Sequence, residues 1–166
     1  MRNALLLAAA ASLLFLPMAV SAQANDQIDV TATVLTPLTV LGTADLDFGN
    51  VIPGLNTTIL PGDVGGGVFA IGGSGTLEVQ LDFGTLPTNL VDGGNTLPIS
   101  FGPSAAGYNT AATPGILTFD PATTMDAPLA SGAMTVYVGG TVAPAASQPQ
   151  GVYTGTLQLT VSYTGN

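Results

Sequence analysis

Residues 151–163 read GVYTGTLQLTVSY, and this stretch decides the fold. Its odd-numbered positions include Leu157, Leu159, Val161 and Tyr163, whereas the even-numbered positions from Thr154 to Ser162 carry only hydroxyl and amide side chains. A β-strand directs successive side chains to opposite faces, so the sequence predicts one face in a core and one in solvent. We therefore expect a final strand that needs pairing partners from earlier in the chain.

The same two-residue period recurs upstream, most clearly over Thr76–Phe83. Shorter strands are predicted at Val68–Ile71, Leu97–Phe101, Ile116–Phe119 and Met134–Val142. Gly and Pro clusters place turns between them, with long loops at residues 103–114 and 121–132. Turns about every ten residues and no helical period after the leader are typical of a β-sandwich or barrel. We predict an all-β fold with antiparallel strands, as a β-sandwich or barrel.

The first 24 residues resemble a secretion signal. Arg2 precedes an apolar run from Ala4 to Val20, and Ala22 and Ala24 satisfy the small-x-small cleavage rule. We expect cleavage before Asn25, with cleavage before Gln23 as the alternative. The run is short for a membrane-spanning helix, and no later segment could span as a helix. The predicted organisation is a signal peptide (1–24), an N-terminal extension (25–35) and a β-sandwich domain (36–166).

Composition excludes much chemistry. Arg2 is the one Lys or Arg, the ten acidic residues all follow the leader, and the chain has no His and no Cys. The mature chain therefore lacks an imidazole base, a thiolate, a Schiff-base lysine and cations for nucleic acid. We expect no cofactor, no metal, no catalytic residues and no nucleic-acid partner. Disulfides cannot stabilise the fold, so burial must do so.

The start of the predicted mature chain, residues 27–40, also keeps a period of two. Ile28, Val30, Ala32 and Val34 share one face. Pro37 interrupts the pattern, and because proline cannot donate to a ladder it indicates an edge or a change of pairing partner. We interpret residues 27–35 and 38–41 as two functional halves.

Three short motifs have both a functional and a structural interpretation. Leu-Asp-Phe-Gly occurs at 46–49 and again at 81–84, which predicts strands that end in a Gly turn. Asp45, Asp47 and Asn50 could offer oxygens to calcium, but a full site needs six or more, so a solvated acidic face is favoured. Tyr108 could stack on a sugar from a loop, although one aromatic residue is weak evidence.

Several motifs together resemble the DUF4402 family of secreted bacterial proteins, which is similar to the spore-coat-U-like subunits of archaic chaperone-usher pili. The motifs are Gln27-Ile-Asp-Val30, Pro37-Leu-Thr-Val40, Leu46-Asp-Phe-Gly49, Val136-Tyr-Val-Gly-Gly140, Gly151-Val-Tyr-Thr-Gly155 and Leu159-Thr-Val-Ser-Tyr163. Pilin relatives often carry a Cys near the position of Leu38, and this chain has none.

The resemblance implies an immunoglobulin-like antiparallel β-sandwich that is incomplete, because its last strand is missing and is supplied by another subunit. The candidate donor strand is Ile28, Val30, Ala32 and Val34, and the candidate acceptor strand is Leu157, Leu159, Val161 and Tyr163. Implied partners are other copies or related subunits, a periplasmic chaperone and an outer-membrane usher. Implied localisation is the periplasm in transit and then the cell surface.

The residues alone point the same way, because an edge strand with an apolar face needs a partner or aggregates. The leading expectation is a non-enzymatic subunit of a bacterial surface fibre. The first alternative is a monomeric secreted or periplasmic binding module, in which residues 27–41 form its own first strand and the 103–114 loop meets ligands. An acidic-pair glycosidase is the third reading, although no spacing indicates converging carboxylates. The sequence leaves open whether residues 27–35 complement their own domain or a neighbour's.

Overall fold

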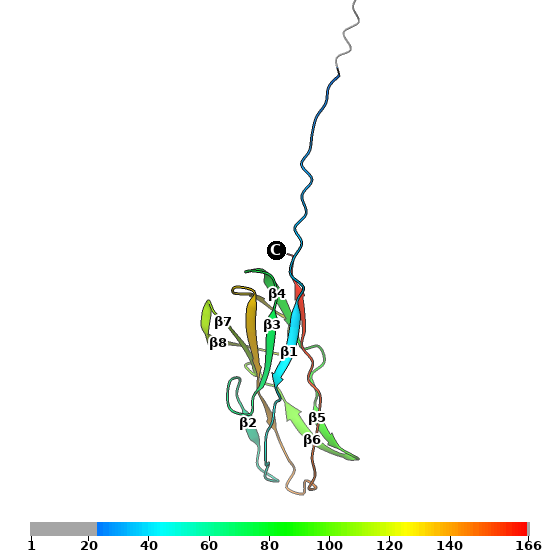
Figure 1. Ribbon diagram of the computed structural model, residues 1–166. Helices are drawn as coiled ribbons and strands as arrows, with labels where there is room; N and C mark the ends of the chain where they lie inside the picture. Colours follow the sequence, from blue (N-terminus) through cyan, green and yellow to red (C-terminus); the bar gives the residue numbers. More distant parts are fainter. Residues whose placement is uncertain (1–22, 166) are drawn as a thin grey trace, which may run out of the picture. The chain divides into compact units, whose positions relative to one another are not determined.

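The structure, a computed structural model, describes residues 23–165 (Figure 1). The predicted signal peptide therefore lies almost entirely outside the described residues. The chain divides into residues 1–33 and residues 34–166. Within the first unit, residues 23–33 have no regular secondary structure and are exposed. No helix in the described part of the chain is long and apolar enough to cross a membrane.

The second unit is an all-β sandwich of antiparallel sheets. The largest sheet has the order β1-β3-β10-β7-β8, a second has the order β2-β11-β6-β5, and a third has the order β12-β4-β9. The strands are β1 (Thr39–Ala44), β2 (Thr57–Ile59), β3 (Gly67–Gly72), β4 (Glu78–Asp82), β5 (Asn89–Asp92), β6 (Asn95–Ser100), β7 (Ala106–Thr110), β8 (Thr113–Phe119), β9 (Met125–Pro128), β10 (Ala133–Val138), β11 (Gly140–Val142) and β12 (Thr160–Tyr163). The predicted all-β sandwich is confirmed.

The main core lies between the five-stranded and three-stranded sheets. Val79 and Leu81 of β4 and Val136 and Val138 of β10 are fully buried. Each contributes about 1.5–3 kcal/mol by removal of its side chain from water. The alternation predicted for Thr76–Phe83 is confirmed, because Val79, Leu81 and Phe83 enter this core.

A second, smaller core lies at the other end of the domain. Only Leu97, Ile99 and Val142 are buried in it, and several half-buried apolar side chains surround them. β10 passes into β11 at Gly139, and through this step one continuous segment serves both cores. A side chain at Gly139 would collide with the Ile59 carbonyl, which explains the glycine at this crossing.

Two of the predicted loops are wrong. Residues 103–114 contain β7, which pairs with both β10 and β8, and residues 121–132 contain β9, which pairs with β4. β7 reads Ala-Gly-Tyr-Asn-Thr and is buried along most of its length. Small residues without large-apolar alternation, flanked by Gly and Pro, hid both strands. Tyr108 is 6% exposed, so the expected sugar-stacking loop residue is a core residue.

The final stretch has the predicted faces but a shorter strand. Leu159 is buried and Tyr153, Leu157, Val161 and Tyr163 are half-buried, whereas the even-numbered residues between them are exposed. Ladder pairing covers only Thr160–Tyr163, against β4, and a single bridge joins Thr154 to Val91 of β5. Residues 155–159 cross from one sheet to the other, so neither sheet pairs with them continuously.

Candidate functional site

An apolar groove of about 990 Å³ runs along the domain between two chain segments. One wall is residues 42–53, which continue from β1, and the other is residues 148–157, which lead towards β12. β1 and β12 are each the outermost strand of their sheets. Figure 1 shows β1 (cyan) beside the C-terminal segment (red). The edge strand β1 with its continuation, and the segment that leads to the edge strand β12, therefore flank one open space.

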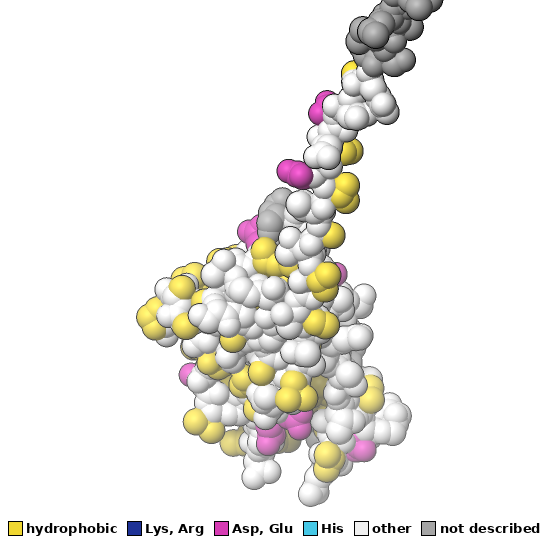
Figure 2. All heavy atoms as spheres, turned by 45° about the horizontal axis from the view of Figure 1, so that its top comes forward, with side chains coloured by type: hydrophobic (Ala, Val, Ile, Leu, Met, Phe, Trp, Pro, Cys, Tyr) yellow, Lys and Arg dark blue, Asp and Glu magenta, His cyan; other side chains and the backbone are white. Residues whose placement is uncertain are grey.

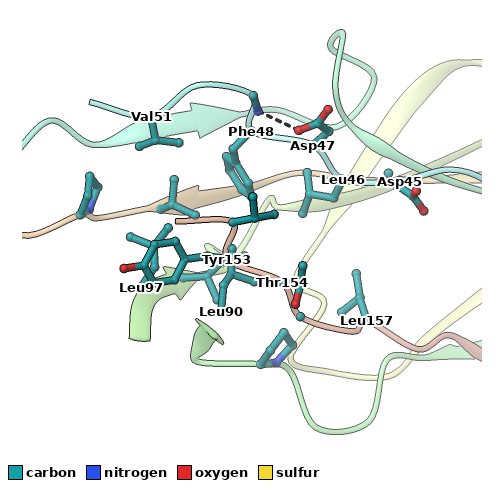
Figure 3. Close-up of a pocket in the computed structure, with 18 of the residues that line it drawn as sticks. Asp45, Leu46, Asp47, Phe48, Val51, Leu90, Leu97, Tyr153, Thr154 and Leu157 are labelled. Atoms are coloured by element: carbon teal, nitrogen blue, oxygen red, sulfur yellow. Dashed lines mark hydrogen bonds between the residues drawn. The ribbon is translucent and has the colours of Figure 1, made fainter. Parts of the chain in front are cut away.

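The floor of the groove is the second core. From this core, the floor includes Leu90 of β5, Leu97 and Ile99 of β6, Phe101 directly after β6, and Val142 of β11, and Phe69 of β3 adjoins them. In Figure 3, Leu46 and Phe48 point into the space from one side, and Tyr153, Leu90 and Leu97 approach from the other. The core buries only three residues fully while six half-buried apolar residues border it, so its apolar surface is incompletely covered.

The first wall is extended but unpaired over most of its length. After β1, residues 45–56 have no strand assignment, and one backbone bond, from the Asp47 N–H to the Gly65 carbonyl at 2.8 Å, holds the middle of the wall. Leu46 and Phe48 are half-buried while Asp45 and Asp47 are exposed, which is the alternation of a strand. This segment has the side-chain pattern of a strand and lacks a partner along it.

Asp47 ends this strand-like segment through its own side chain. Its Oδ1 accepts a hydrogen bond from the Gly49 N–H at 2.8 Å, and Gly49 has φ +60° (Figure 3). The second Leu-Asp-Phe-Gly motif repeats this geometry, because Asp82 Oδ1 accepts from the Gly84 N–H at 2.7 Å and Gly84 also has φ +60°. Positive φ favours glycine, so the predicted Gly turn is confirmed at both sites.

The second wall is held from one side only. Val91 of β5 and Thr154 exchange backbone hydrogen bonds of 2.8 and 2.9 Å, and β4 pairs with β12 further along. Near its start, the Tyr153 hydroxyl donates to the Pro149 carbonyl at 2.8 Å and accepts from Gln148 Nε2 at 2.7 Å. These bonds fix the wall from β5 and from the 148–150 turn. Its other edge faces the groove.

The candidate acceptor residues divide between two places. Leu157 lines the groove, whereas Leu159, Val161 and Tyr163 pack against the main core. The candidate donor residues are all exposed: Ile28 at 86%, Val30 at 90% and Val34 at 94%, with Ala32 exposed as well. In Figure 2, hydrophobic side chains gather along one side of the extension and carboxylates along the other.

The electrostatic character of the groove is acidic. Asp45 and Asp47 line it, and residues 23–165 contain no Lys, Arg or His to neutralise them. Asp47 is engaged with Gly49, and no group of three or more acidic, His or Cys side chains among the described residues is placed to hold a metal ion. Asp45, Asp47 and Asn50 therefore give no support to the calcium interpretation.

Of the candidate donor and acceptor residues named from the sequence, only Leu157 lines the groove; the calcium candidates Asp45, Asp47 and Asn50 line it as well. Sequence reasoning missed Leu46, Phe48 and Val51 on the first wall and Leu90, Leu97, Ile99 and Val142 on the floor. The alternation of Leu46 with Phe48, and of Leu97 with Ile99, was a usable signal. The assembly of these pairs around one space depends on long-range sheet pairing, which alternation does not encode.

Together these features define an all-β sandwich with an open apolar groove between two sheet edges. A family model described as "Domain of unknown function (DUF4402)" matches residues 38–163. The chain belongs to this family. No curated protein matches the sequence.

Proposed function

We propose that this chain is a non-enzymatic structural subunit of a bacterial surface fibre, assembled by β-strand addition. In this proposal residues 27–35 of one copy lie in the groove of the next copy, between residues 42–53 and 148–157. The chain is exported by its signal peptide, passes through the periplasm with a chaperone and an outer-membrane usher, and ends at the cell surface. The observation that carries the proposal is the groove, an open apolar space between two sheet edges.

The extension has the chemistry of a strand that the groove would accept. Ile28, Val30 and Val34 are large, exposed and on one face of an extended segment. Burial of these three side chains would contribute about 5 to 9 kcal/mol before ordering costs. Its other face carries Asp29, Thr31 and Thr33, which would remain in solvent. The exposed apolar side chains of the extension could therefore cover the apolar residues that line the floor of the groove.

The extension is long enough to run past the first wall. Residues 27–35 are nine residues, which extend about 30 Å at roughly 3.3 Å per residue. The strand-like part of that wall, residues 45–48, is shorter, because it ends at the Gly49 turn. An inserted strand could add backbone hydrogen bonds to wall residues that have no strand partner.

The competing function is a monomeric secreted or periplasmic binding module. The segment at which that hypothesis placed ligands, residues 103–114, contains β7 and the start of β8 and is not one long loop. The groove could serve such a module by accepting an extended peptide of another protein. The two functions differ in whether the chain's own extension is required.

Substitutions on the two faces of the extension separate these functions. Val30→Asp places a carboxylate on the apolar face, where no Lys or Arg of residues 25–166 can pair with it, at a cost of several kcal/mol. Thr31→Asp adds the same charge on the opposite face and is the matched control. We expect multimers of wild type and Thr31→Asp, and a folded monomer for Val30→Asp, by light scattering. Monomers of all three proteins would contradict the fibre proposal and favour the binding module.

A further inference from the structure

One hydroxyl group joins three segments at the point where the extension meets the domain. The Tyr163 hydroxyl donates to the Thr36 carbonyl at 2.8 Å and accepts from the Ser74 N–H at 2.6 Å. The half-buried tyrosine packs against the main core. The chain before β1, the β3–β4 turn and the last strand therefore meet at this atom.

The neighbouring residues fix the same point from the other side. Leu38 packs against the main core, and Thr39 is the first residue of β1, opposite Gly72. A Cβ on Gly73 would lie 2.8 Å from both the Leu38 side chain and the Tyr163 hydroxyl, so a larger residue there would displace these groups. Pro37 in turn restricts Thr36 to extended conformations. Residues 36–39 are thus held in place by hydrogen bonding, packing and local sterics.

This restraint limits self-insertion. If residues 27–35 folded back along β1 while Thr36 stayed bonded, the tightest turn would use residues 33–36. Val30 would then lie opposite Thr39, and Ile28 opposite Leu41, so both would stop short of Leu46 and Phe48. Val34 would be lost to the turn. With Thr36 released, a turn over residues 35–38 would advance Ile28 to a position opposite Asp45, at the unpaired wall.

We infer that Tyr163, through its hydrogen bond to Thr36, is a positioning residue that commits the extension to the groove of a second copy by preventing insertion into its own. The inference rests on the proposed function. It adds a residue that determines whether the extension enters its own groove or that of a second copy. A second copy has no such constraint, because its groove can meet the extension in the register that places Ile28, Val30 and Val34 over the floor.

Cysteine cross-linking of the full chain tests this directly, because the chain has no native Cys. Val30→Cys is combined with Leu46→Cys, and the protein is treated with a short bismaleimide, which tolerates small register differences. Denaturing gels separate covalent multimers from internally linked monomers. Mixed single-cysteine proteins identify the bands that form between copies. The quantity measured is the fraction of all cross-links that form within one chain, called here the internal share.

With Tyr163 intact we expect a covalent ladder. In a Pro37→Ala background, Tyr163→Phe should raise the internal share about 2- to 10-fold over Pro37→Ala alone, the factor expected for the lost hydrogen bond to Thr36. Tyr137→Phe on β10 is the matched control and should leave the share unchanged. Phe retains the ring of Tyr163, so the domain should stay folded, and this is checked by its melting curve.

The other possible outcomes separate the inference about Tyr163 from the proposed function. Predominantly internal linkage with Tyr163 intact would overturn the inference and show that the groove is filled by its own extension. An unchanged internal share in the Tyr163→Phe, Pro37→Ala protein, with the ladder preserved, would overturn the inference and leave the proposed function standing. Cross-links of neither kind would overturn both.

Discussion

Val91 and Thr154 exchange two backbone hydrogen bonds, 2.8 and 2.9 Å long, and this pairing leaves the opposite edge of the final segment open. Further along, β4 pairs with residues 160–163. Residues 148–157 line the groove, across from the unpaired segment that follows β1. The open groove is therefore a consequence of where the sheets find their partners.

Leu159 provides the sharpest test of the final segment as a core element. It is 7% exposed and packs in the main core, so Leu159→Asp buries an unpaired carboxylate and should abolish folding. Thr160→Asp, at the next and exposed position, should change the free energy of unfolding by less than about 1 kcal/mol. Circular dichroism during urea titration measures both. Equal effects of the two substitutions would contradict the inward face assigned to Leu159.

The groove floor and the main core should respond differently to truncation. Phe48→Ala removes a half-buried side chain that borders the groove, so it should weaken assembly more than it destabilises the domain. Phe83→Ala removes a side chain that is 3% exposed and should cost about 3–5 kcal/mol of unfolding free energy. Unfolding titrations and light scattering of both proteins make the comparison. A larger loss of stability for Phe48→Ala than for Phe83→Ala would contradict the division into two cores.

Association should strengthen on acidification. The extension carries Asp26 and Asp29, the groove is lined by Asp45 and Asp47, and no basic side chain of residues 25–166 offsets them. Protonation of these carboxylates lowers the repulsion between copies, so assembly should be greater at pH 4–5 than at pH 8, and salt should reduce the difference. Light scattering across this range measures it. Weaker assembly at acidic pH would indicate carboxylates that accept specific hydrogen bonds at the joint.

The exported protein should lack every target of trypsin. Cleavage before Asn25 removes Arg2, the one Lys or Arg of the sequence. Protein recovered from the cell surface should therefore have the mass of residues 25–166 and remain uncut by trypsin even in urea. Dithiothreitol should have no effect on its stability, because the chain has no Cys. Recovery of Arg2 in the surface protein would contradict the predicted cleavage.

The alternation of large apolar residues along the sequence was enough to predict features that lie within a single strand or turn. The inward face of Leu157–Tyr163, the burial of Val79 and Leu81, and both Leu-Asp-Phe-Gly turns follow from single strands or turns. β7 was missed because Ala106 and Gly107 are buried by neighbours on both sides rather than by a period of two. The groove was missed as a site because its floor combines β3, β5, β6 and β11, which only long-range pairing brings together.

The most direct test of the central claim is hydrogen exchange of the Val30→Asp chain with and without a synthetic peptide of residues 25–35. This chain keeps an intact groove while its own extension is disabled. The account predicts that the peptide slows amide exchange in residues 45–53 and 151–159 and leaves β10 unchanged, because new strand pairing forms only at the two walls. A peptide carrying Val30→Asp should have no effect. Unchanged exchange at both walls with the wild-type peptide would contradict the account.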